Sequence, residues 1–134
     1  MDANMIATAR ASYERALHAP SFFEDFYAEL FRRCPEAEPR FANTDFIRQH
    51  RLIRHGIGLL LNYPGRIEES PNILERIAER HSRRDLDVPG PMYTPFIEAL
   101  LAVLGRHDPD YCDSVQAAWK ETLAPGIEYM RSRH

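Results

Sequence analysis

The chain has 134 residues, of which 44% are hydrophobic and 28% charged, a composition suited to one compact domain over residues 1–134. Seventeen Lys and Arg against twenty Asp and Glu give a net charge of −3. We therefore expect no nucleic acid and no anionic membrane as partners. No apolar run approaches the length of a transmembrane helix, and the N-terminus lacks a secretory pattern, so the expected location is cytoplasmic.

Apolar residues recur every three or four positions along the whole chain, and no long alternating run predicts a strand. The predicted fold class is therefore all-α. In chain order we expect helices over 4–18 and 21–33, a corner over 34–43, a helix over 45–62, a short helix over 70–81, a loop over 85–91, a helix over 92–105 and a last helix that begins at 108.

Helix-start signals support several of these boundaries. Ser21 and Glu24 have the spacing of a capping box, and either Thr44 or Asp45 can cap the helix that follows. Pro71 suits the first turn of the short helix, where its missing N–H leaves no hydrogen bond unmade.

A histidine ends the apolar stripe of that short helix. His81 follows Ile73, Leu74, Ile77 and Ala78 at offsets that place all five on one face. An imidazole turned toward a core needs a partner, which is either a backbone carbonyl or a bound group.

Polar side chains also occur among apolar ones on two earlier helices. Tyr27 lies within the aromatic stripe of the helix over 21–33, and Gln49 shares a helix face with Ile53. Both can donate a hydrogen bond, although each on its own is also compatible with an ordinary structural role. Phe41 is the one large apolar residue of the corner.

Three groups of residues resemble a known family when they are taken together. They are Phe26 to Phe31 with Pro35, Glu36 and Phe41; Leu74 to His81 with Val88, Pro89 and Tyr93; and Ala118 with Trp119. This combination resembles the bacterial single-domain globins and the haem domain of flavohaemoglobins over about residues 6–130. The resemblance implies a globin fold, with six to eight helices around a haem pocket.

The resemblance also implies roles for individual residues. His81 matches the proximal histidine that binds haem iron, and Tyr27 matches the distal tyrosine. Phe41 matches the phenylalanine that stacks on the porphyrin. Gln49 matches the distal glutamine, with Ile53 as the apolar residue over the iron. His50 remains an alternative to Gln49 as the distal residue.

Further residues follow as contacts of the implied cofactor: Ile77, Arg80, Val88 and Tyr93. Arg80 matches a basic position beside the haem propionates, and Arg51, Arg54 and Arg84 are other candidates for this contact. The second ring nitrogen of His81 needs a partner, for which a carbonyl near Ile77 is favoured over a carboxylate. Because no Cys-x-x-Cys-His motif is present, the expected cofactor is noncovalent haem b.

The resemblance implies reversible binding of dioxygen, or of nitric oxide or carbon monoxide, at ferrous iron for storage, delivery or scavenging. An alternative is a nitric oxide dioxygenase that relies on a separate reductase, since the chain is too short to hold its own. A gas sensor acting through a partner and a haem-free interaction module are further alternatives. Monomer and homodimer both remain open.

Overall fold

The structure is a computed structural model that describes residues 3–82 and 88–134. In this part of the chain there are six α-helices, three short 3-10 helices and no strand, which confirms the all-α prediction. Their bounds are α1 Ala3–Ala16, α2 Phe22–Arg33, η1 Pro35–Phe41, α3 Phe46–Asn62, η2 Tyr63–Gly65, α4 Glu75–His81, η3 Gly90–Met92, α5 Tyr93–His107 and α6 Asp113–Ser132.

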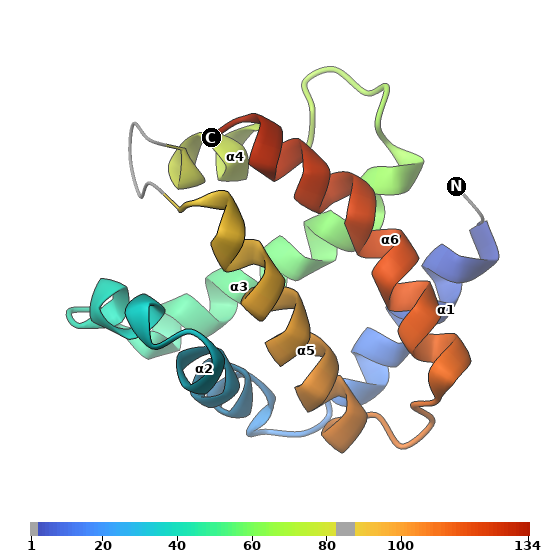
Figure 1. The fold of residues 1–134 in the computed structure, drawn as a ribbon. Helices are drawn as coiled ribbons and strands as arrows, with labels where there is room; N and C mark the ends of the chain where they lie inside the picture. Colours follow the sequence, from blue (N-terminus) through green and yellow to red (C-terminus); the bar gives the residue numbers. More distant parts are fainter. Residues whose placement is uncertain (1–2, 83–87) are drawn as a thin grey trace.

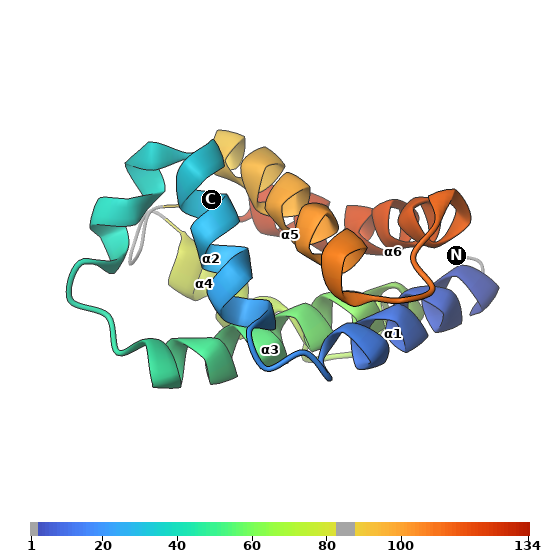
Figure 2. The ribbon, with the colours of Figure 1, turned by 90° about the horizontal axis from the view of Figure 1, so that it is seen from below.

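The helices are arranged as two crossing groups. Seen from below, α1 and α3 lie along one side of the molecule and α5 and α6 along the other (Figure 2). The face-on view shows α4 close to the end of α6 (Figure 1). The closest packing joins α2 with α5 and α1 with α6.

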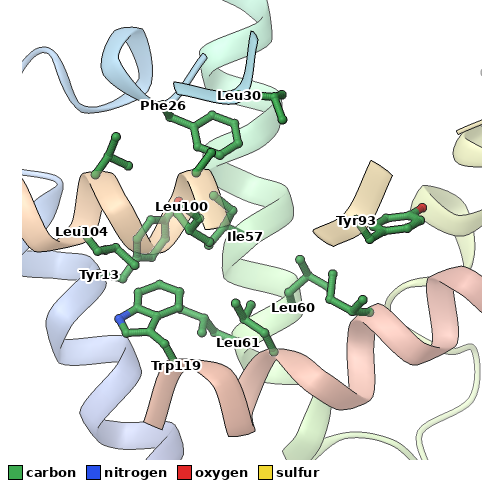
Figure 3. Packing of buried hydrophobic residues seen from close by; sticks show 14 of the residues in the cluster. Tyr13, Phe26, Leu30, Ile57, Leu60, Leu61, Tyr93, Leu100, Leu104 and Trp119 are labelled. Carbon is green, nitrogen blue, oxygen red and sulfur yellow. The ribbon is translucent and has the colours of Figure 1, made fainter. Parts of the chain in front are cut away.

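The centre of the core is Trp119 on α6, which is fully buried among side chains from three helices (Figure 3). Its indole Nε1 donates a hydrogen bond of 2.9 Å to the Ser12 hydroxyl on α1. The ring of Tyr13 meets it edge-on at 5.8 Å. Because a buried indole N–H needs an acceptor, these contacts fix α6 against α1.

An ion-pair network fixes α2 against α5. The Glu29 carboxylate accepts hydrogen bonds of 2.9 Å from both Arg32 and Arg33 of its own helix. It also pairs with Arg106 of α5. These three arginines lower the pKa of Glu29 to about 2. The network holds the helix that carries Tyr27 in place.

Three predicted helix-start signals are wrong, and the first two concern Ser21 and Pro71. The Ser21 hydroxyl donates to the Asp25 carboxylate at 3.1 Å and makes no cap bond, so the capping box does not form. The helix α4 starts at Glu75 because the Asn72 side chain accepts a 2.8 Å bond from the Leu74 N–H, which leaves Pro71 outside the helix.

The last helix starts at Asp113 rather than at Asp108, because Asp108 has another role. This buried carboxylate accepts bonds of 2.6 Å from both the Ser12 hydroxyl and the Arg15 Nε. It therefore ties the segment before α6 to α1. Residues 83–87, which hold part of the predicted loop, lie outside the described residues.

Candidate functional site

The predicted distal tyrosine lies in an aromatic cluster. Tyr27 is on the inner face of α2 and only 5% exposed. Its ring centroid lies 5.0 to 5.9 Å from five other rings, which belong to Phe26, Phe31, Phe41, Phe46 and His50. Burial raises the pKa of Tyr27 to about 12, so the phenol keeps its proton at neutral pH and can donate a hydrogen bond.

The predicted distal glutamine reaches this tyrosine. Gln49 Nε2 donates a 2.9 Å hydrogen bond to Tyr27 Oη across the interface between α3 and α2. Asp45 sets the start of α3, because its carboxylate accepts bonds from the N–H groups of Ile47 and Arg48 at 3.0 and 3.4 Å. This confirms Asp45 as one of the two expected caps.

The alternative distal residue lies beside the same tyrosine. The His50 ring stacks on Tyr27 with a centroid distance of 5.9 Å and an interplanar angle of 11°. It also contacts the rings of Phe23 and Phe46. Gln49 therefore supplies the hydrogen bond, whereas His50 packs against the tyrosine face.

The predicted proximal histidine is the last residue of α4 and is half-buried. Its Nδ1 donates a 2.8 Å hydrogen bond to the Ile77 carbonyl, which is the partner that the sequence favours. Because a carbonyl oxygen only accepts, Nδ1 carries the proton in this bond. In a neutral ring the lone pair then belongs to Nε2, the nitrogen suited to bind a metal.

Close packing with α6 holds α4 in position. Gly126 of α6 lies so near that a Cβ added there would be 2.6 Å from Leu60 Cδ2 and 3.2 Å from Leu74 Cδ1. Leu74 immediately precedes α4 and is fully buried. The absence of a side chain at Gly126 thus allows the backbone of α6 to approach both α3 and α4.

The apolar residues of the predicted site share one property: each is only half-buried although it packs against the core. They are Phe41, Ile53, Ile77 and Val88. Tyr93, at the edge of the core cluster far from Trp119, is buried (Figure 3), and burial raises its pKa to about 12. Arg80 is exposed next to His81.

This donor set fits a haem group. His81, whose Nδ1 is bonded to a carbonyl, would hold a haem iron through its other ring nitrogen, and the Tyr27 phenol, which accepts from Gln49, would donate to a small polar ligand. Half-buried apolar side chains from η1, α3, α4 and the segment before η3 provide surface that a flat apolar group would cover. Among residues 3–82 and 88–134, no three His, Cys, Asp or Glu side chains gather into a site that would hold a metal without a porphyrin.

The comparison with protein families decides the class. A family model described as Globin matches residues 24–128. The chain belongs to the globin family. Its fold also matches the crystal structure of protein PA3967 from Pseudomonas aeruginosa PAO1, described as structurally highly homologous to a human haemoglobin, with a TM-score of 0.89. The two are 30% identical, and the match covers 96% of this chain and 97% of the other.

No curated protein sequence matched this globin. The globin fold predicted from the residues is confirmed, and haem is the cofactor that the family generally binds. In the described part of the chain, no helix has both the length and the apolar character needed to cross a membrane.

Three residues of the aromatic cluster around Tyr27 were not predicted as part of the site. Phe26, Phe31 and Phe46 contact the ring of Tyr27 at centroid distances of 5.0, 5.9 and 5.4 Å. Helical spacing could have indicated Phe31 and Phe46, because Phe31 lies four residues after Tyr27 and Phe46 lies three residues before Gln49.

Proposed function

We propose that residues 1–134 form a single globin domain that binds haem b noncovalently and binds dioxygen, or another diatomic gas, reversibly. Haem, when bound, would supply a ferrous iron with one position for the gas. The protein supplies the proximal ligand, the distal hydrogen-bond donors and an apolar surrounding. The observation that carries this proposal is the hydrogen bond from Gln49 to Tyr27.

The direction of that bond is important. Because Tyr27 Oη accepts from Gln49 Nε2, the phenol proton points elsewhere and can be donated to a ligand. Donation from the amide also polarises the phenol O–H, which makes it a stronger donor. A gas ligand that gains partial negative charge at the haem would be stabilised by this buried phenol donor, and its release would be slowed.

We assign His81 as the proximal ligand through Nε2. Its Nδ1 bond to the Ile77 carbonyl fixes the ring orientation. A neutral carbonyl partner leaves the imidazole less electron-rich than a carboxylate partner would, and this favours reversible binding over oxidative chemistry.

We further assign Phe41, Ile53, Ile77, Val88 and Tyr93 as contacts of the porphyrin and Arg80 as a partner of a propionate. Four of these are the half-buried apolar residues described above, which would gain burial from a bound porphyrin. Arg80 follows Glu79 on the exposed last turn of α4, where a guanidinium can reach a carboxylate at the rim.

The second candidate is a nitric oxide dioxygenase, which the same pair of donors favours because both functions need slow release of dioxygen. Turnover would require a separate reductase to supply electrons to the haem. Sustained nitric oxide consumption in the presence of a reductase would establish the enzyme, whereas slow rereduction would leave the reversible binder.

Visible spectra of the purified protein in its ferric, ferrous and carbon monoxide-bound forms test the proposal. We expect a Soret band that shifts with each state. His81→Ala should lose or greatly weaken it, whereas His55→Ala, an exposed histidine of α3, should keep it. A protein that folds in excess haem without a Soret band would refute the haem assignment and favour the haem-free module.

A further inference from the structure

The exposed side of α3 differs in charge from the rest of the chain. Between Asp45 and Glu68 there is no acidic residue, although the whole chain has a net charge of −3. This segment contains four arginines, of which three lie on α3: Arg48, Arg51 and Arg54. All three are exposed, and none forms an ion pair within residues 3–82 and 88–134. A cluster of solvated, uncompensated guanidinium groups attracts anions.

The exposed apolar side chains occur in the same segment. In the described part of the chain, the exposed large hydrophobic residues are Ile47 at 74%, Leu52 at 53% and Ile67 at 49%. Each is next to an arginine in sequence. Ile47 and Leu52 lie on α3 beside arginines that have no ion-pair partner among the described residues, whereas Arg66, beside Ile67, pairs with Glu69. The coincidence of exposed apolar side chains and unpaired cations on α3 indicates a contact surface.

Helical geometry places the α3 members of this set on one face. At 100° per residue, an arc of about 140° on α3 contains five of these residues and neighbours: Ile47, Arg48, Arg51, Leu52 and His55. Gln49 and Ile53 lie on the opposite side, toward α2 and the core. We call this outward arc, together with Arg54 at its edge, the basic face of α3.

A hollow of about 430 Å³ opens beside the basic face, between α3 and α1. Arg51, Arg54 and His55 contribute cationic or polar groups to it, and Leu17 and Leu59 contribute apolar walls. Its size and lining suit a phosphate headgroup that is attached to an apolar chain.

We propose that the basic face of α3 docks this protein on the surface of an anionic phospholipid bilayer. The arginines would contact headgroup phosphates while Ile47 and Leu52 insert at the boundary with the acyl chains. The apolar pair favours a bilayer over nucleic acid, whose phosphates offer no apolar partner. It also favours a bilayer over an acidic protein patch, since a convex helix enters a fluid interface without a matching groove.

The overall net charge predicted no attraction to anionic membranes, and the proposal rests instead on how the charge is distributed. It does not depend on haem, because the proposed haem site assigns the propionate contact to Arg80 and uses none of the basic-face residues. A failure of docking would therefore leave the proposed gas binding intact, and the reverse also holds.

Flotation with phospholipid vesicles tests docking. The haem-loaded protein, or the apoprotein if no haem is retained, is mixed with vesicles of phosphatidylcholine alone or of phosphatidylcholine and phosphatidylglycerol in equal parts. We expect it to float with the anionic vesicles only, and less of it as sodium chloride is raised. Equal flotation with both vesicle types, or none with either, would overturn the proposal.

Variants separate the basic face from overall charge. Arg48→Gln, Arg51→Gln and Arg54→Gln combined should lower vesicle partitioning by more than about tenfold, since each arginine near an anionic surface strengthens binding by about fivefold. The matched control removes three exposed cations elsewhere: Arg10→Gln, Lys120→Gln and Arg133→Gln. It should partition like the wild type. Equal loss in both triple variants would refute a defined docking face.

The apolar contribution is tested without a change of charge. Leu52→Ser should weaken binding to anionic vesicles by about tenfold. Because Leu52 is 53% exposed, this variant should keep the helical content and thermal midpoint of the wild type. Undiminished binding of a folded Leu52→Ser protein would rule out insertion. If the triple arginine variant does not fold, the three single arginine variants take its place in the flotation assay.

Discussion

Tyr27→Phe is the sharpest test of the distal assignment, because it removes one hydroxyl and little else. The ring is surrounded by five aromatic rings and is 5% exposed, so phenylalanine fills the same space without leaving a large cavity. Two interactions change: the proposed donor to the gas ligand is lost, and Gln49 Nε2 loses its acceptor.

The expected effect is faster release of dioxygen. A hydrogen bond to a partly charged partner contributes about 1.5 to 3 kcal/mol. If that energy is lost from the bound state alone, the dissociation rate rises by about 10- to 100-fold. The freed amide of Gln49 can turn toward the ligand and recover part of the loss, which places the expected value near the lower end of this range.

Stopped-flow dissociation of dioxygen, with carbon monoxide as the competing ligand, measures this rate. Tyr13→Phe is the matched control, because it removes a second buried phenol whose hydroxyl donates to the Arg54 carbonyl at 2.9 Å, away from the proposed gas site. It should leave the rate unchanged. A Tyr27→Phe rate within about twofold of the wild type would show that the phenol does not contact the ligand.

Three further predictions concern the proximal side and the framework. His81→Gly should lose haem affinity, and added imidazole should restore the Soret band; no rescue by imidazole in a folded variant would contradict ligation by this ring. Glu29→Gln should destabilise the fold by about 1 to 2 kcal/mol near neutral pH. Because the folded pKa of Glu29 is about 2, below its ordinary value of 4.5, its contribution is full above pH 4.5 and is lost as the pH falls toward 2, so denaturant midpoints of wild type and variant should converge in acid. Gly126→Ala should destabilise by about 1 to 3 kcal/mol, since the new Cβ meets two leucine side chains. Gly105→Ala, within α5 and with its nearest contact at 3.6 Å, should be neutral or slightly stabilising in the same thermal melts; equal destabilisation at both glycines would refute the close approach of α6.

The sequence predicted helix faces better than helix starts. Apolar spacing depends on which side of a helix is buried, so α2 and α3 agree with their predictions within about a residue. Helix starts depend on single capping side chains, and such a side chain can bond to a distant residue instead of the helix. Asp108 has the local sequence of a helix start, yet it bonds Ser12 and Arg15 from a helix more than ninety residues earlier. Such a partner is invisible to local pattern reading.

In the candidate site, too, the sequence predicted which side chains point inward but not which of them contact each other. Periodicity placed Tyr27 and Gln49 on inward faces, but it could not predict that they meet, because they are 22 positions apart and the corner at η1 lies between them. The fold that brings them together also decides which one donates, since an amide nitrogen at 2.9 Å from a protonated phenol oxygen leaves the phenol proton for a third atom. The bond between Gln49 and Tyr27 therefore turns two separately ambiguous residues into one directed donor chain, which ends in the phenol proton that we propose is donated to a gas ligand.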